Sequence, residues 1–309
     1  MRVLGLDTSN YTTSAAVFDG REGDNRSRLL EVRPGELGLR QSDALFQHVK
    51  RLPALLEQLA EEGQLKNVQA VGASTRPRAV EDSYMPCFLA GESQGKVLAA
   101  ALDIPFFAFS HQEGHLAAAA WSAGRLDLLD RPFLAWHLSG GTTELLRVEP
   151  QGASVRAEIV GGTSDISAGQ LMDRIGAILG LPFPAGKALD ALSRQGEAAA
   201  FQVKLCGLTF SLSGMENQGK AMAERGEPPA NVARFAVETA ADVVLRATAE
   251  AQRRWPGLPV LCSGGVASNS LLQERLTTSC QALFAPTQYS TDNAAGVAVL
   301  TWRAEEATR

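Results

Sequence analysis

The stretch Leu6-Asp7-Thr8-Ser9-Asn10-Tyr11-Thr12-Thr13 follows an apolar run at the start of the chain, and a related stretch occurs near the middle, His137-Leu138-Ser139-Gly140-Gly141-Thr142-Thr143. Both contain the end of a predicted strand, a turn with a serine, a Thr-Thr pair and the start of a return strand. The similarity lies in position more than in letters, because each instance opens one half of the chain. This internal repeat predicts two halves with related folds.

Strands and helices alternate along both halves, which indicates an α/β protein with mixed sheets. Two related halves that face a cleft are typical of actin-like and sugar-kinase-like ATPases. We therefore expect a two-lobed actin-like ATPase fold with mixed sheets and a central nucleotide cleft. The polar stretch 124–131 predicts the domain boundary. The first lobe would span 1–130 and be completed by a C-terminal helix over about 291–309, and the second would span 131–290 with a helical insertion.

The composition is that of an ordinary soluble protein, with 45% hydrophobic and 20% charged residues among 309. No apolar run is long enough for a membrane span, and no signal peptide precedes the first strand. The four cysteines are scattered without a CxxC pair, which favours reduced thiols and a cytoplasmic location.

The net charge of −5 argues against a dedicated, non-specific nucleic-acid binder, because neutralisation of phosphates supplies most of the affinity of such proteins. A nucleic-acid site would have to be a local patch. Arg33, Arg40, Arg76 and Arg78 are candidates for it. Arginines on a solvated surface are the alternative reading.

Two of the four histidines, His111 and His115, stand four residues apart after the apolar run 104–109. Ser110 and Glu113 have the spacing of a capping box, which predicts a helix that begins at His111. Both imidazoles would then lie on one face of that helix and could bind a zinc- or iron-type ion. The alternative is a half-exposed pair of histidines without a metal.

Two Ser-Gly-Gly turns, at 139–141 and 263–265, each follow an apolar strand. Backbone amides without neighbouring side chains can approach a phosphate closely, although a simple tight turn would have the same sequence. Three aspartates have plain readings by pattern alone. Asp173 is a solvated carboxylate, Asp190 a charge near a helix start or an acceptor of ribose hydroxyls, and Asp292 the N-cap of the last helix.

Hydrolase chemistry finds no support in the sequence. There is no GxSxG elbow, and no cysteine has a convincing motif around it. The zincin motif needs a glutamate directly after the first histidine, where this chain has Gln112. We therefore do not expect a peptidase.

Taken together, the motifs resemble the tRNA threonylcarbamoyladenosine transferase family, formerly called O-sialoglycoprotein endopeptidases, over nearly the whole chain and in the family's order. Besides the histidine pair and the first Ser-Gly-Gly turn, the resemblance includes Ala168–Asp173, Leu179–Gly186, Phe210–Gly214 and Gly264–Asn269. It implies metal ligands at His111, His115 and Asp292. It implies nucleotide or substrate contacts at Leu138, Ser139, Gly140, Gly141, Asp173, Gly186, Asp190 and Asn269.

The resemblance also implies the chemistry. The ligands would be one divalent metal, iron or zinc, and ATP or threonylcarbamoyl-AMP. The reaction would be transfer of the carbamoyl group from that adenylate to a tRNA adenosine, with the metal as Lewis acid and turn amides holding the departing phosphate. The implied partners are tRNA and, in a homo- or heterodimer, other threonylcarbamoylation proteins.

Several positions depart from the family pattern. Tyr11-Thr12 stand in place of an acidic pair, Glu216 in place of a lysine, and Arg76-Pro77-Arg78 in place of a Gly-Pro-Gly loop. These departures are typical of a divergent paralogue. Two other functions stay open: carbamoyl-type transfer to a small molecule, and a non-catalytic ATP-binding partner of a true transferase.

Overall fold

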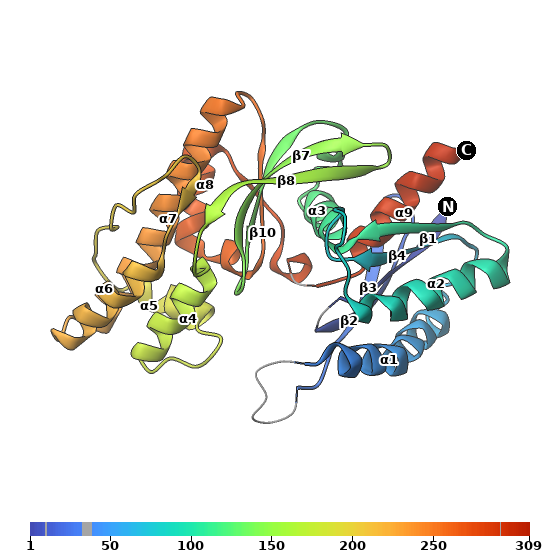
Figure 1. The fold of residues 1–309 in the computed structure, drawn as a ribbon, viewed down its shortest axis with the longest axis horizontal. Helices are drawn as coiled ribbons and strands as arrows, with labels where there is room; N and C mark the ends of the chain where they lie inside the picture. Colours follow the sequence, from blue (N-terminus) through green and yellow to red (C-terminus); the bar gives the residue numbers. More distant parts are fainter. Residues whose placement is uncertain (10, 33–38, 291) are drawn as a thin grey trace. The chain divides into compact units, whose positions relative to one another are not determined.

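The computed structural model describes residues 1–9, 11–32, 39–290 and 292–309. Arg33, one of the patch candidates, and Asn10 in the first turn lie outside the described residues. The chain divides into two compact units (Figure 1). Unit 1 comprises Met1–Arg131, Glu149–Ala157 and Thr291–Arg309, and unit 2 comprises Pro132–Val148 and Glu158–Ser290.

Unit 1 contains a five-stranded mixed sheet in the order β3-β2-β1-β4-β5. Strands β1, β2 and β3 are antiparallel neighbours, whereas β4 and β5 run parallel to β1. The strands are β1 (Arg2–Asp7), β2 (Thr12–Phe18), β3 (Gly23–Leu29), β4 (Val68–Arg76) and β5 (Phe106–Ser110). The helical segments are α1 (Gln41–Glu61), η1 (Pro86–Phe88), α2 (Leu89–Leu102), α3 (His111–Ser122), η2 (Leu126–Asp130) and α9 (Ala295–Thr308).

The alternation of side chains along β1 places helices on both faces of this sheet. Leu4 and Leu6 pack in one apolar cluster with residues of α1 and α2. Gly5 points to the other face, where an added Cβ would lie 2.4 Å from the backbone nitrogen of Ala298 in α9. Since successive residues of a strand face opposite sides, a glycine between two leucines lets α9 approach the sheet closely.

Unit 2 contains a six-stranded mixed sheet in the order β11-β10-β6-β7-β8-β9. The strands are β6 (Phe133–Leu138), β7 (Thr143–Gln151), β8 (Ser154–Thr163), β9 (Thr209–Phe210), β10 (Val260–Ser263) and β11 (Leu283–Phe284). The helical segments are α4 (Ala168–Ile178), α5 (Gly186–Ser193), α6 (Ser213–Glu224), α7 (Pro229–Arg254), η3 (Gly265–Ser268), α8 (Ser270–Cys280) and η4 (Thr287–Tyr289). Helix α7 supplies much of the core, with residues such as Val237, Ala240 and Val244 fully buried.

The predicted α/β class with mixed sheets is confirmed. Strand β3 is a polar edge strand that gives no hydrophobic signal in the sequence. The buried face of α1 includes His48, whereas Val49 is 47% exposed.

The stretch 124–131, expected to be a polar linker, includes the short helix η2. Leu128 and Leu129 are fully buried there. None of the helices described in the structure combines the length and apolarity that a membrane crossing requires.

Candidate metal and nucleotide sites

The predicted capping box fixes where helix α3 begins. The hydroxyl of Ser110 accepts a hydrogen bond from the backbone N–H of Glu113 (3.2 Å), and the Glu113 carboxylate accepts one from the N–H of Ser110 (2.6 Å). The prediction is confirmed in both bonds. Helix α3 therefore starts at His111, with His115 one turn further on the same side.

Three side-chain atoms meet beside this turn in unit 1. The Nε2 atoms of His111 and His115 lie 2.8 Å apart, and Oδ1 of Asp292 lies 3.5 and 3.3 Å from them. Two nitrogen ligands of one ion, each bound at about 2.1 Å, need a similar separation. Within the described residues, this is the group of His, Cys, Asp and Glu side chains close enough together to hold a metal ion.

Asp292 does not cap the last helix, which was the alternative reading. The N-cap residue is Ala294, which has no side-chain capping bond, and Oδ1 of Asn293 accepts the N–H of Ala295 (3.0 Å). The Asp292 carboxylate is directed to the two imidazoles. The donor set of two imidazoles and one carboxylate suits zinc or iron.

Asp7 belongs to the same site and was missed as a site residue at the sequence level. Its Oδ2 lies 2.8 Å from Nδ1 of His111, and its Oδ1 accepts the N–H of Ser9 (2.9 Å). A proton on Nδ1 shared with the carboxylate fixes the tautomer that leaves Nε2 free for a metal. The only available signal was the position of Asp7 at the carboxyl end of β1. The parallel strand β5, which directly precedes His111, ends at the same edge of the sheet.

Two carboxylates control the protonation of His111. Burial disfavours its charged form, but Asp7 and Asp292 outweigh burial and raise the pKa of His111 to about 10. Burial would likewise raise the pKa of both carboxyls, yet His111 lowers each of them below its ordinary value. A helix N-terminus disfavours a cation, and these two negative charges offset that effect.

A cavity of about 500 Å³ lies within unit 2 and has the size of a small-molecule site. Five of the predicted nucleotide residues line it: Gly140, Asp173, Gly186, Asp190 and Asn269. Leu138, Ser139 and Gly141 do not. The remaining lining residues include Gly169, Met172, Lys187, Gly265 and Val266.

Asp190 and Asn269 are joined directly on the wall of this cavity. The Asn269 amide donates to Oδ1 of Asp190 (3.1 Å), and Ser270 donates from its hydroxyl (2.8 Å) and its N–H (3.3 Å) to the same carboxylate. Asn269 also caps α8 by accepting the N–H of Leu272 (3.1 Å). These bonds hold both polar groups in fixed positions before a ligand arrives.

Asp173 holds the neighbouring turn. Its Oδ1 accepts the N–H of Ala185 (2.7 Å), directly before α5 begins at Gly186. The carboxylate thereby ties α4 to the start of α5. Asp173 therefore shapes the cavity as well as lining it.

Glycines let the chain segments around the cavity approach each other. At Gly264 φ is +101°, and an added Cβ would lie 2.1 Å from the carbonyl oxygen of Leu138. Leu138 itself is fully buried, so it contributes a backbone wall rather than a side chain. At Gly169 an added Cβ would lie 2.5 Å from both the Ser139 oxygen and the Gly140 Cα.

The Ser139–Thr142 segment is also a tight turn, as the alternative reading supposed. Its backbone bond runs from Ser139 N to Thr142 O (2.8 Å), and the Ser139 hydroxyl accepts the N–H of Thr142 (3.1 Å). Open space nevertheless surrounds the Cβ positions of Gly140 and Gly141. A turn and an anion contact are therefore compatible here.

The positions that depart from the family pattern have ordinary surroundings. Tyr11 is 36% exposed and Thr12 is buried in β2. Glu216 on α6 pairs with Arg174 on α4, with its Oε2 2.6 Å from Nη1. The charge of Glu216 is thus balanced within unit 2.

Sequence comparison finds relatives over nearly the whole chain. A family model for tRNA N6-adenosine threonylcarbamoyltransferase matches residues 37–299. A protein of that name from Thermus thermophilus is 37% identical, over 98% of this chain and 93% of the relative. Another from Paracidovorax citrulli is 34% identical, over 96% and 89%.

Solved structures with the same fold are more distant in sequence. HypF from T. kodakarensis aligns over 99% of this chain and 48% of its own, with a TM-score of 0.59 and 13% identity. A putative N-acetylmannosamine kinase from Listeria monocytogenes aligns over 100% of both chains, with a TM-score of 0.54 and 11% identity. These neighbours confirm the expected actin-like ATPase fold.

Proposed function

The chain belongs to the tRNA N6-adenosine threonylcarbamoyltransferase family, and from that premise we propose that it transfers a threonylcarbamoyl group from threonylcarbamoyl-AMP to an adenosine of tRNA. Membership in the family makes it a transferase of tRNA modification and not a peptidase. The donor, the residues that bind it and the metal are the proposed parts. The observation that carries them is the convergence of His111, His115 and Asp292 on one point.

The proposed reaction is an acyl-type substitution at the carbamoyl carbon. The exocyclic amine of adenosine forms a new C–N bond to that carbon, and the bond from the carbon to the phosphate oxygen breaks. AMP leaves with the electron pair, and the amine gives up one proton. Atoms and charges balance without an oxidant, a reductant or a second nucleotide.

The cavity of unit 2 would bind the nucleoside part of the donor. Asp190 and Asn269 offer a carboxylate and an amide on one wall, and both are held by hydrogen bonds. A carboxylate of this kind can accept the hydroxyl groups of a ribose. Gly140 and Gly141 are exposed with open space at their Cβ positions, and a phosphate would bind at this turn.

The three ligands of unit 1 would hold one divalent metal, iron or zinc. When bound, the metal supplies a Lewis acid. Asp7 orients His111 through Nδ1, so that the Nε2 lone pair is directed to the ion. The paired carboxylates Asp7 and Asp292 compensate the charge of the ion at the start of α3.

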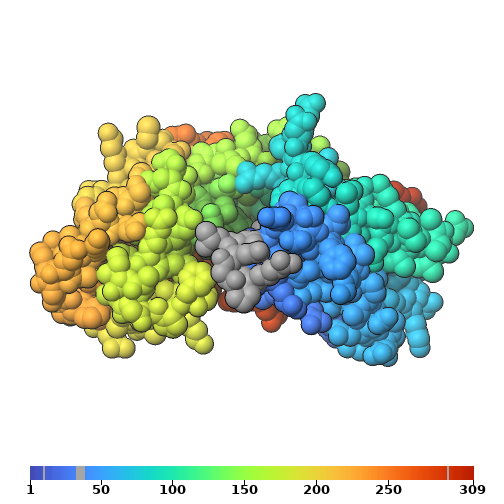
Figure 2. Space-filling model, turned by 60° about the horizontal axis from the view of Figure 1, so that its bottom comes forward, coloured from blue at the N-terminus to red at the C-terminus, as the bar shows by residue number. Residues whose placement is uncertain are grey.

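We further propose that the protein acts in the cytoplasm and assembles with other threonylcarbamoylation proteins or with a second copy. Helices α1 and α2 belong to the same surface region of unit 1, coloured blue and teal in Figure 2. They carry exposed apolar side chains, among them Phe46 (64%) and Val97 (65%). These side chains would lie in the proposed contact.

The test is incubation of metal-loaded protein with threonylcarbamoyl-AMP, with and without unmodified tRNA, followed by mass spectrometry of the nucleosides. We expect threonylcarbamoyladenosine in the tRNA and release of AMP. Donor turnover without any need for tRNA would favour a small-molecule acceptor instead. Tight ATP binding without turnover, even with partner proteins added, would indicate a non-catalytic role.

A further inference from the structure

Residues 77–85, which connect β4 to η1, form a segment that we call the arch, and its first end is fixed beside the metal ligands. Arg76, at the end of β4, pairs in register with Ser110 at the end of β5. The next residue, Pro77, accepts a hydrogen bond through its carbonyl from the N–H of Gln112 (3.0 Å). The arch therefore starts one strand spacing from the residue that precedes His111.

The other end of the arch is fixed at the same place. Directly after it, the carbonyl of Cys87 accepts a hydrogen bond from the hydroxyl of Thr8 (3.0 Å). The ring of Phe88 lies 6.2 Å from the ring of His111, measured between centroids. Both ends of the arch thus adjoin the histidine of the candidate metal site.

The arch has a defined internal structure that leaves two apolar side chains in solvent. The N–H of Arg78 donates to the hydroxyl of Ser83 (3.0 Å), which closes the loop. Tyr84 is 63% exposed and Val80 58%. In Figure 2, cyan atoms of this part of the chain stand out from the surface. An exposed aromatic ring on an ordered loop is suited to stack on an unpaired base.

Arg76 adds a positive charge at the first end of the arch. Its side chain is exposed, and no other described residue pairs with its guanidinium. Glu81 and Asp82 at the tip of the arch would repel a phosphate. A polyanion would therefore meet the arch at Arg76 and Tyr84 rather than at its tip.

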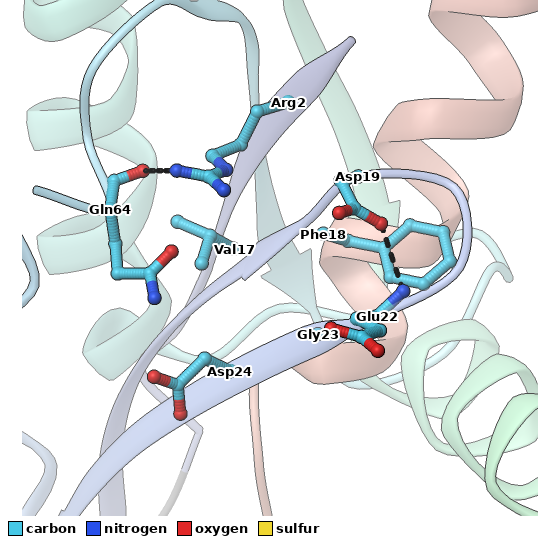
Figure 3. Close-up of a pocket in the computed structure, with 8 residues that line it drawn as sticks. All are labelled: Arg2, Val17, Phe18, Asp19, Glu22, Gly23, Asp24 and Gln64. Atoms are coloured by element: carbon cyan, nitrogen blue, oxygen red, sulfur yellow. Dashed lines mark hydrogen bonds between the residues drawn. The ribbon is translucent and has the colours of Figure 1, made fainter.

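The opposite edge of the same sheet has mixed charge. A pocket there is lined by Asp19, Glu22 and Asp24 together with Arg2, whose guanidinium donates to the backbone oxygen of Gln64 (3.3 Å) (Figure 3). Arg26 pairs with Asp24, and Arg21 is exposed at the same edge. This edge therefore offers a comparison for Arg76: an exposed arginine that lies among carboxylates, away from the metal ligands.

We propose that the arch and the adjoining Arg76 form a docking element for the acceptor RNA, in which Arg76 binds a backbone phosphate and Tyr84 stacks on an unpaired base near the target adenosine. This inference rests on the proposed function. The proposed recognition element begins where the family pattern has a Gly-Pro-Gly loop. Stacking and one phosphate contact suit the single-stranded loop of a hairpin RNA better than a duplex.

The test measures binding of a fluorescent, unmodified RNA hairpin with an unpaired loop to the full chain by anisotropy at several salt concentrations. Arg76→Ala should weaken binding and reduce the slope of log Kd against log salt by about one. Arg21→Ala is the matched control. Arg21 is also exposed and has no described side-chain partner, but it follows β2 at the opposite edge of the sheet.

A second pair of variants tests the ring. Tyr84→Ala should weaken RNA binding about tenfold, whereas Tyr84→Phe, which keeps the stacking surface, should bind within about twofold of the unaltered protein. AMP and metal binding should be the same for all variants, which shows that they are folded.

The proposal is overturned if Arg76→Ala and Tyr84→Ala bind the hairpin as the unaltered protein does, or if Arg21→Ala loses as much as Arg76→Ala. Normal tRNA modification alongside either result would leave the proposed function intact. An unaltered protein that neither binds nor modifies RNA would overturn both.

Discussion

The two candidate sites are built by different means. The site of unit 1 consists of ionisable side chains, two imidazoles and two carboxylates, that depend on each other's charge. The cavity of unit 2 is lined in part by glycines, and its carboxylates Asp173 and Asp190 are already occupied by internal hydrogen bonds. The first is ready to exchange a proton for a metal ion, and the second has a shape that exists before any ligand binds. Substitutions should therefore damage the two sites in different ways.

Removing a metal ligand should have the largest effect. His111→Ala and Asp292→Ala each delete one of three converging donor atoms, and we expect metal affinity to fall by at least about 1000-fold. Asp7→Asn, which changes only the partner of His111, should lose about 10- to 100-fold. Elemental analysis and metal titration measure these changes. AMP binding to unit 2 should remain, and a full metal content in the alanine variants would refute the ligand assignment.

A backbone substitution should have the next largest effect, and only in unit 2. Gly264→Ala would place a methyl group against the Leu138 carbonyl at a left-handed φ. We expect a loss of about 3 kcal/mol in the free energy of unfolding, together with weaker AMP binding. Gly265→Ala is the control, because no atom lies within 4 Å of its added Cβ. Urea unfolding should separate the two variants, and equal stabilities would contradict the packing described.

Acid should destabilise unit 1 through His48. This residue is fully buried, and its Nδ1 lies 2.8 Å from the Thr13 hydroxyl. Burial lowers its pKa from 6.5 to about 4, so the unfolded chain binds the proton first as the pH falls. The stability that the neutral ring provides is thus present above pH 6.5 and lost towards pH 4, by about 2 kcal/mol at pH 5.

The measurement is urea unfolding at pH 7 and pH 5 for the unaltered protein and for His48→Gln. The variant should lose less stability between the two pH values, by about the same 2 kcal/mol. An identical pH dependence in both proteins would show that His48 does not titrate as described.

The smallest effect should come from a single polar contact in the cavity. Asp190→Asn places an amide where the carboxylate now accepts bonds from Asn269 and Ser270. We expect AMP affinity to fall about tenfold with little change in metal affinity. Asp242→Asn, on α7 and paired with Arg246, is the control. Calorimetry measures the affinity for AMP. Equal affinities of Asp190→Asn and the unaltered protein would show that Asp190 does not belong to the site.

The sequence predicted those parts of the sites that depend on local spacing. The capping box of Ser110 and Glu113 and the histidines four apart need only one helix turn, and the structure has both as expected. Asp292 was assigned through family resemblance, because it stands 177 positions after His115 in the sequence. Asp7 was missed because its contact with His111 depends on the pairing of β1, β4 and β5, which no local pattern encodes.

Parts of the fold were hidden for a similar reason. Strand β3 is polar and lies at the edge of its sheet, so backbone pairing with β2 defines it rather than an apolar face. The buried position of His48 was also unexpected, since an imidazole at a core position of a helix looks polar in a hydrophobic pattern. Long-range contacts decided each of these features.

The most direct test of the account is a crystal structure of metal-loaded protein with AMP, with anomalous diffraction measured at the edge of the metal. We expect one anomalous peak about 2.0–2.3 Å from Nε2 of His111, Nε2 of His115 and a carboxylate oxygen of Asp292. We expect AMP in the cavity of unit 2, against Asp190 and Asn269. A metal bound elsewhere, or AMP outside that cavity, would contradict the account.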